Sequence, residues 1–215
     1  MKVDLQHAAP AEIETRSMEI ITAELGDRVL NPENRSVILR CIHTTADFEY
    51  ADSLTFSPHA VSRGTEALKS GTGIVTDTTM VQSGINKRVL SGFGGQIYNF
   101  IADPSVAAEA KERGMTRSAV SMERAAAMGQ SLVYAIGNAP TALIRLYELW
   151  DDGQLPPPAL IIGVPVGFVN VVEAKELILT MDCPFIVARG RKGGSNVAAA
   201  ICNALLYAAS ENRRE

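Results

Sequence analysis

Pro184-Phe-Ile-Val-Ala-Arg-Gly-Arg-Lys-Gly-Gly-Ser-Asn196 places an apolar strand, a basic glycine-rich loop and the start of a small-residue helix in direct succession. The loop combines three cations with glycines, which let a ligand approach the backbone. Ser195 or Asn196 can cap the helix, whose N-terminus carries partial positive charge. We therefore expect an anion site here, although a plain strand-to-helix turn with a solvated basic tip fits the same residues. The spacing differs from that of the usual phosphate-binding loop.

Strands and helices alternate from residue 73 onward, after an N-terminal third that is expected to be all-helical. This alternation is typical of a mostly parallel sheet with both faces covered. We predict one α/β domain over residues 1–215, with a mostly parallel five-stranded sheet, helices on both faces and an N-terminal helical segment. The expected strands are Gly73 to Thr76, Gln96 to Ile101, Leu132 to Ile136, Ala159 to Val164 and Phe185 to Ala188.

Helix starts are indicated by a capping side chain before a helical pattern, in three cases with proline at the first helical position. These starts are predicted at Asn31-Pro32, Ser57-Pro58, Asp103-Pro104 and Thr116.

Composition excludes several functional classes. The net charge of −4 and the pI near 5.5 argue against general nucleic-acid binding, which needs a basic surface. The cysteines and histidines show neither C-x-x-C nor i, i+4 ligand spacing, so we predict no disulfide framework and no protein-bound metal. Gly92-Phe-Gly-Gly95 precedes a strand instead of following one, which fails the dinucleotide fingerprint. We therefore expect no nucleotide cofactor.

The sequence also gives no sign of membrane insertion. Met1 to Pro10 has no hydrophobic core for a signal peptide. The apolar run Leu160 to Val172 contains Pro165 and Asn170 and is too short to span a bilayer. We expect a cytoplasmic protein with no membrane partner.

In an open α/β sheet the ligand crevice lies beyond the carboxyl ends of the strands. The segments expected there are poor in carboxylates, with Asp77 the main acid. Backbone donors and cations suit a large anionic ligand with apolar surface better than a metal ion or a hydrolytic nucleophile. Two simpler roles fit the same residues, because Asn138 can cap the helix through Trp150 and Asp77 can cap the next turn. The segments are Asp77-Thr-Thr-Met80, Gly137-Asn-Ala-Pro-Thr141, Gly163-Val-Pro-Val-Gly-Phe168 and Arg189 to Ser195.

His43 lies near the end of the helix expected after Asn31-Pro32. At 100° per residue it falls opposite the apolar stripe, on the side of Ser36 and Arg40, so it faces solvent or a cleft. The carbonyls of a helix C-terminus favour an imidazolium, which suits a donor or acceptor for a weakly basic ligand nitrogen. An exposed histidine at a helix end with no function is the alternative.

Six motifs, in order along essentially the whole chain, resemble the precorrin-8X methylmutase family of cobalamin biosynthesis. They are Ile42-His-Thr-Thr-Ala-Asp-Phe48; Thr76-Asp-Thr-Thr-Met80 with Ser83-Gly-Ile-Asn-Lys-Arg88; Thr116-Arg-Ser118; Gly137-Asn-Ala-Pro-Thr-Ala-Leu143; Gly163-Val-Pro-Val-Gly-Phe-Val169 with Glu173-Ala-Lys175; and Gly190-Arg-Lys-Gly-Gly-Ser-Asn196.

The resemblance implies an α/β homodimer that binds a polycarboxylate tetrapyrrole and releases a corrin product. The implied reaction is an intramolecular 1,5-sigmatropic shift of a methyl group from C-11 to C-12, without methyl donor, redox cofactor or protein-bound metal. By resemblance, His43 acts on a ring nitrogen near the migrating methyl. The substrate-binding residues implied with it, in part as partners for acetate and propionate arms, are Ser17, Asp77, Lys87, Arg117, Asn138, Arg191, Gly193, Gly194 and Ser195.

The amino-acid sequences of the first, second and last motifs are more similar to those of the family branch that acts on cobalt-precorrin-8 than to those of the branch that acts on the metal-free substrate. Two other functions stay open on the sequence: a tetrapyrrole carrier without turnover, and a phosphate-ligand enzyme that uses the glycine-rich loop.

Overall fold

The computed structural model describes residues 12–210, so the segment Met1 to Pro10 lies outside the described residues. A six-stranded sheet has the order β1-β6-β5-β4-β2-β3. β1 is antiparallel to β6, and all other neighbouring strands are parallel. The strands are β1 (Leu54–Phe56), β2 (Ile74–Thr76), β3 (Ile97–Tyr98), β4 (Val133–Ile136), β5 (Leu160–Gly163) and β6 (Phe185–Ala188).

The five predicted strands are all present, but the sheet has a sixth strand, β1. The predicted number of strands and the prediction of an all-helical N-terminal third are therefore wrong. β1 has three residues, too few for a recognisable apolar run, and it forms by pairing Leu54 with Ala188 at the edge of β6. Strand β3 is also shorter than the predicted Gln96 to Ile101, since only Ile97 and Tyr98 pair with β2.

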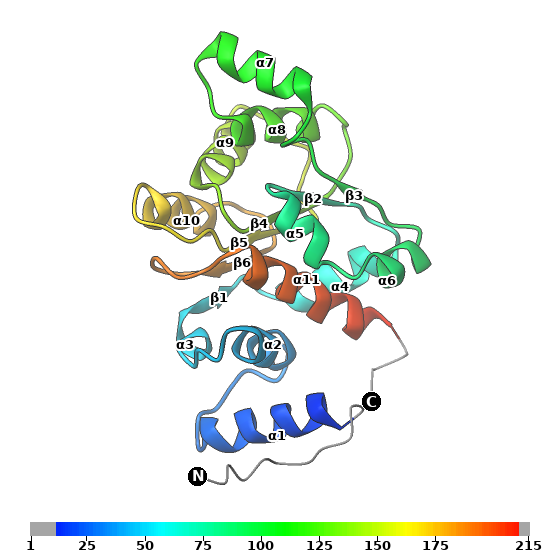
Figure 1. Ribbon diagram of the computed structural model, residues 1–215, viewed down its shortest axis with the longest axis vertical. Coiled ribbons are helices and arrows are strands. Elements are labelled where there is room, and N and C mark those ends of the chain that lie inside the picture. The colour runs from blue at the N-terminus through cyan, green and yellow to red at the C-terminus, as the bar shows by residue number, and fades with distance from the viewer. Residues whose placement is uncertain (1–11, 211–215) are drawn as a thin grey trace, which may run out of the picture.

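Helices cover both faces of the sheet, as predicted (Figure 1). Ile74, Val133 and Leu160 pack into one cluster with residues of α2, α4 and α11, while their neighbours Val75 and Tyr134 pack into a second cluster with α8, α9 and α10. This division follows from the pleat, because successive strand residues point to opposite faces.

Among the described residues the helices have the following bounds. They are α1 (Ile13–Leu25), α2 (Arg35–Thr45), α3 (Tyr50–Ser53), α4 (Ala60–Lys69), α5 (Thr79–Gly84), α6 (Lys87–Gly92), α7 (Pro104–Arg113), α8 (Arg117–Ala126), α9 (Pro140–Asp151), α10 (Val171–Leu179) and α11 (Ser195–Ala209).

Two of the four predicted helix caps are confirmed and two are wrong. Asp103 caps α7 and Thr116 caps α8, each through a hydrogen bond to a backbone amide. Asn31 instead accepts from the amide of Glu33 in a turn before α2. The hydroxyl of Ser57 accepts from the amide of Phe185, so it secures β1 beside β6 and does not cap α4.

No helix in residues 12–210 combines the length and apolar character needed to cross a membrane.

Candidate functional site

Asp77 joins two of the predicted site segments at the carboxyl ends of β2 and β4. Its buried carboxylate accepts from the amides of Gly137, Asn138 and Ala139 at 3.0, 2.8 and 2.7 Å. Burial raises the pKa of Asp77, and the three amide bonds oppose that shift. Asp77 therefore holds the start of α9, whereas Thr78 caps the next turn, α5.

Asn138 is exposed and does not cap α9, which begins after Ala139 without a side-chain cap. The carboxylate of Asp77 takes that role across the sheet. The Asn138 side chain therefore lies at the carboxyl edge beside β4, in the position expected for a ligand contact.

The loop between β6 and α11 is held close to the end of β5. The Gly194 amide donates to the Val164 carbonyl at 2.8 Å, and the Gly167 amide donates to the Arg191 carbonyl at 3.2 Å. Gly193 has φ +157°, and a Cβ there would lie 2.1 Å from the Val164 oxygen. Only glycine permits this approach, so Gly193 shapes the loop and the Gly194 amide already has a partner.

The sequence predicts that either Ser195 or Asn196 caps α11, and that prediction is wrong because α11 begins after Gly194 without a side-chain cap. The Ser195 hydroxyl lies 3.1 Å from the hydroxyl of Thr78 and so joins α11 to α5. Within the described residues, the backbone amides of Ser195 and Asn196 make no hydrogen bond to protein.

Exposed apolar side chains surround this edge of the sheet. Met80 is 68% exposed, Phe168 83% and Val169 77%. The Arg191 guanidinium lies over the Phe168 ring, 5.6 Å from its centroid. The edge therefore offers apolar surface next to a cation, which matches a ligand that carries carboxylates on an apolar ring.

His43 is exposed in the last turn of α2, off the buried stripe, as predicted. Lys192 connects the loop between β6 and α11 to this end of α2. Its ammonium lies 2.6 Å from Oδ2 of Asp47 and 2.7 Å from Oε2 of Glu49. Both carboxylates follow directly after α2. The structure therefore places the His43 end of α2 beside the cationic loop.

A cavity of about 580 Å³ lies between α1, α2 and the C-terminal half of α11. Ser36 and Arg40 of α2 line it, and His43 follows one turn later on the same face of the helix. Arg40 pairs with Glu14 of α1 at 2.7 Å. The full lining is Glu14, Thr15, Met18, Pro32, Arg35, Ser36, Leu39, Arg40, Ala204, Tyr207 and Ala208.

Ser17 and Lys87 lie on this side of the molecule and not at the glycine-rich loop. Ser17 is partly exposed on α1, next to the cavity residue Met18. Lys87 is exposed at the start of α6, where the preceding Asn86 donates to Tyr207 near the end of α11. The predicted residues therefore form two groups, which the exposed face of α2 connects.

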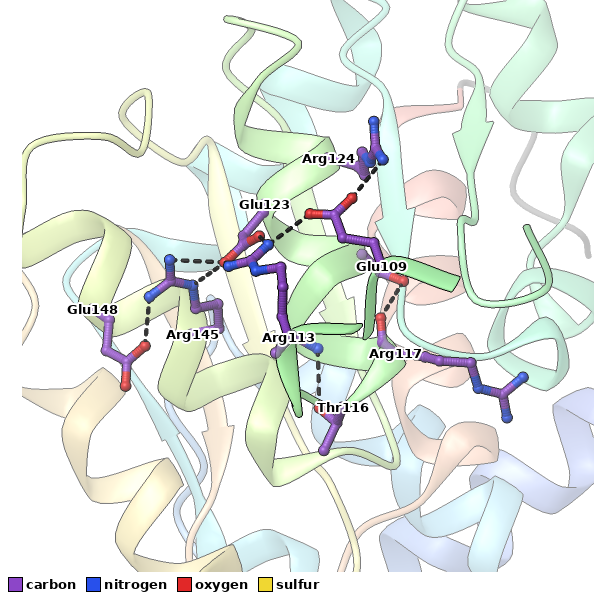
Figure 2. Close-up of polar contacts among 10 residues, drawn as sticks. Glu109, Arg113, Thr116, Arg117, Glu123, Arg124, Arg145 and Glu148 are labelled. Carbon is purple, nitrogen blue, oxygen red and sulfur yellow. Dashed lines mark hydrogen bonds and ion pairs between the residues drawn. The ribbon is translucent and has the colours of Figure 1, made fainter. Parts of the chain in front are cut away.

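Arg117 begins α8, and Thr116 before it donates to Thr141 of α9 at 2.9 Å. Figure 2 shows the Arg117 side chain extending away from the neighbouring ion pairs. In the described part of the chain it has no carboxylate partner, whereas Arg113 and Arg145 are both held by Glu123. The network fixes α7, α8 and α9 together and leaves Arg117 available to a ligand. Its ion pairs join Arg113 to Glu109 and Glu123, Arg124 to Glu109, and Arg145 to Glu123 and Glu148.

Lys175 is a site-region residue to which the sequence reasoning gave no role. It is fully buried, and its ammonium donates to the carbonyls of Gly190 and Lys192, both at 2.8 Å. A signal was present in the sequence, because Lys175 shares the helical stripe of Val171, Ala174 and Ile178, where an apolar residue is expected. The Lys192 bridge had no such signal, since its partners are far away in sequence.

Within residues 12–210, no three histidine, cysteine, aspartate or glutamate side chains gather as metal ligands.

Relatives of known name match almost the whole chain. Cobalt-precorrin-8 methylmutase from Priestia megaterium is 43% identical over 196 residues, covering 91% of this chain and 87% of the relative. The enzyme of the same name from Salmonella typhimurium is 44% identical over 204 residues, covering 92% and 95%. Precorrin-8X methylmutase from Pseudomonas aeruginosa is 38% identical over 192 residues, covering 88% and 91%.

A solved structure supports the same relationship. Precorrin-8X methylmutase from Thermus thermophilus superposes with a TM-score of 0.85 at 38% identity, covering 92% of this chain and 97% of that one. The family model described as precorrin-8X methylmutase matches residues 12–208. With these matches along nearly its entire length, the chain belongs to the precorrin-8X methylmutase family.

Proposed function

We propose that the chain moves a methyl group from C-11 to C-12 of a precorrin-8 macrocycle, as an isomerase of corrin-ring biosynthesis. The bond from the methyl to C-11 breaks while the bond to C-12 forms, so the product has the same atoms as the substrate. One observation carries the proposal: the exposed His43 end of α2 lies beside a cationic loop that is bordered by exposed apolar side chains.

His43 has the role of acid in this proposal. An imidazolium that donates to the ring nitrogen near the migrating methyl withdraws electron density from the conjugated system and lowers the barrier. A site that fixes the macrocycle adds to the rate by holding the reacting atoms in position. The chemistry then needs no group beyond the substrate and the side chains of the protein.

The substrate carboxylates are assigned to cations at the edge of the site. Arg117 and Arg191 suit planar carboxylates because a guanidinium can donate two parallel hydrogen bonds. Lys87 and Ser17 are assigned to arms that reach the cavity side of α2, and Asn138 and Ser195 to arms at the carboxyl edge. Asp77 and Gly194 contribute by shaping the site, since their polar groups are bound within the protein.

We favour cobalt-precorrin-8 as the substrate, because several relatives at 36–44% identity carry the name cobalt-precorrin-8 methylmutase. The expected product is then cobyrinate, and hydrogenobyrinate is the product from the metal-free substrate. Cobalt enters with the substrate in this proposal and is not bound by the protein.

The proposal also includes a homodimer in the cytoplasm. A macrocycle is broad for one domain of this size, and α1 exposes Ile13 and Ile20. A second chain that covers such surface and completes the wall of the site would couple ligand binding to assembly.

The function is tested by incubating the purified protein with enzymatically made precorrin-8, with and without cobalt, while recording absorption spectra. Appearance of the corrin spectrum supports the proposal. Binding of the tetrapyrrole without any spectral conversion would instead identify a carrier. Protection from heat by nucleotides or sugar phosphates, and not by tetrapyrroles, would favour a phosphate-ligand enzyme.

A further inference from the structure

Lys175 is a buried cation that the proposed chemistry does not use. It lies on the inner face of α10 between Val171 and Ile178, fully shielded from solvent. An aliphatic side chain would fit this stripe without the cost of removing a charge from water. The presence of a lysine at this position therefore points to a role in the loop that Lys175 contacts, between β6 and α11.

Two backbone carbonyls solvate the ammonium. The Lys175 Nζ donates to the oxygens of Gly190 and Lys192, each at 2.8 Å, and within the described residues it has no carboxylate partner. Burial lowers its pKa to about 8, so the amine is still protonated at pH 7. The positive charge of Lys175 therefore lies directly beneath the loop between β6 and α11.

The two contacts with Lys175 also fix the direction of two loop amides, because the C=O and the N–H of one peptide group have a fixed relative orientation. In a planar trans peptide the C=O and the N–H point in opposite directions. The Gly190 carbonyl shares its peptide with the Arg191 amide, and the Lys192 carbonyl shares its peptide with the Gly193 amide. Carbonyls that point inward to Lys175 therefore direct both amides outward, away from α10.

Neither of these amides is occupied by the protein. Within residues 12–210, the amides of Arg191 and Gly193 donate no hydrogen bond, in contrast to that of Gly194, which binds the Val164 carbonyl. The backbone of Gly193 is pressed against that same carbonyl, so the loop has little freedom to turn the peptide over. The two outward amides above a buried ammonium are therefore unoccupied donors that can bind an anion.

We propose that Lys175 is the positioning residue of the loop: it holds the carbonyls of Gly190 and Lys192 inward, so that the amides of Arg191 and Gly193 face the ligand and donate to its carboxylate. These donors differ in part from Gly193 and Gly194, the loop residues that the family resemblance implies for substrate binding. Only the identity of the carboxylate, as an arm of the tetrapyrrole, rests on the proposed function.

The test uses the full chain with Lys175→Met, which keeps an unbranched apolar side chain of nearly the same length and removes the ammonium donors. Binding of the corrin product is expected to weaken about tenfold or more, because the two amides lose their common orientation. KM should rise by a similar factor while kcat changes less than about threefold, since His43 is untouched. Lys175→Arg, which retains a buried donor, is expected to recover part of the affinity.

Two control variants separate positioning from general loss of stability. Ile178→Ala removes a buried side chain from the same helix, and Lys69→Met removes an exposed charge from the end of α4. Both are expected to bind product as the wild type does. An equal loss of affinity in Ile178→Ala, or unchanged affinity in Lys175→Met, overturns the proposal. If Lys175→Met does not fold, Lys175→Gln is measured under the same criteria.

A second readout does not depend on the tetrapyrrole. In NMR spectra of the labelled protein, succinate is expected to shift the amide signals of Arg191 and Gly193 in the wild type and in Lys69→Met, and not in Lys175→Met. If succinate shifts these signals while the protein neither binds nor converts precorrin-8, the positioning role stands and the proposed function fails. If succinate leaves both signals unmoved in the wild type, the carboxylate site is refuted.

Discussion

The Lys192 ammonium lies 2.6 Å from Oδ2 of Asp47, which fastens the loop between β6 and α11 to the segment after α2. Their hydrogen bond raises the pKa of Lys192 and lowers that of Asp47. His43 precedes Asp47 by about one helical turn. The pair therefore sets how far the His43 end of α2 lies from the loop between β6 and α11.

Replacing Lys192 with Met is expected to affect function more than stability. The Lys192 side chain is 47% exposed, so the ion pair is screened by solvent and its loss should lower Tm by no more than about 3 °C. The release of the loop from α2 should lower kcat/KM about threefold or more, because misplacement of the reacting groups reduces the rate. Differential scanning calorimetry and steady-state kinetics measure the two effects. A large fall in Tm with unchanged kinetics would assign the pair to stability alone.

His43→Ala is expected to lower turnover about a hundredfold or more, the usual scale for loss of an acid–base group, with little change in folding. The exposed position of His43 makes the structural cost small. His59→Asn is the matched control, since His59 is also exposed and its left-handed backbone accepts asparagine. Near-normal activity of His43→Ala across the pH range would remove His43 from the mechanism.

Comparison of the two substrates sharpens the test of His43. In cobalt-precorrin-8 the cobalt ion itself withdraws electron density from the conjugated ring, so the acid has less to contribute. The loss of turnover on His43→Ala should therefore be larger with the metal-free substrate than with the cobalt substrate. Equal losses with both would mean that His43 does not act at a ring nitrogen.

Arg117→Ala and Arg191→Ala are each expected to weaken product binding by about 1.5–3 kcal/mol, the scale of a lost charge-assisted hydrogen bond. Both guanidinium groups are exposed at the carboxyl edge, and Arg191 also lies over Phe168. Fluorescence titration with the corrin product measures the affinities. Arg63→Ala, an exposed arginine on α4, serves as the control and should bind normally. Unchanged affinity in both test variants would place the carboxylate contacts elsewhere.

The parallel part of the sheet could be predicted because each buried strand is an apolar run followed by a helix start. β1 could not, because its strand conformation comes from pairing with β6 and not from its own three residues. The same limit applied to the caps: Asn31 and Ser57 have the right chemistry for a helix start, yet their side chains bind a turn amide and a neighbouring strand.

In the candidate site, the exposure of His43 followed from helical periodicity, which is a local property. The role of Asp77 depends on amides about sixty residues away, and Lys192 pairs with Asp47 across a sequence separation of 145 residues. Such contacts are decided by strand order, which local sequence patterns do not reveal, so the partners of these side chains could not be predicted from the sequence.

The dimer prediction is checked by light scattering. The protein should have about twice the 23.0 kDa mass of the chain, and corrin should tighten the association if a second chain supplies part of the wall. Ile20→Glu on α1 tests whether the exposed apolar face takes part, because a charge there is costly at an interface core. A strictly monomeric protein that binds and converts substrate would show that one chain builds the whole site.

The last prediction concerns the pH dependence of stability that Lys175 confers. Its pKa is about 8 in the folded protein, against an ordinary value of 10.5. Between these values the unfolded chain binds the proton and the folded chain does not, so the stability of the fold rises as pH increases from 8 to 10.5. The same stability is lost as pH falls from 10.5 to 8, and below 8 this group adds no further pH dependence. The difference in unfolding free energy between wild type and Lys175→Met should increase by up to about 3 kcal/mol from pH 8 to pH 10.5.

Urea unfolding of both proteins at several pH values measures this difference. Contributions from groups that titrate in both proteins cancel in the difference in unfolding free energy. These groups include Tyr50 and Cys183, whose burial raises their pKa to about 12. Lys69→Met provides the reference for the replacement of an exposed lysine by Met. If the difference in unfolding free energy between wild type and Lys175→Met does not change with pH, the carbonyls of Gly190 and Lys192 solvate the charge as fully as water does. The ammonium would then cost the fold nothing, and the argument that Lys175 is kept for its effect on the loop would lose its energetic basis.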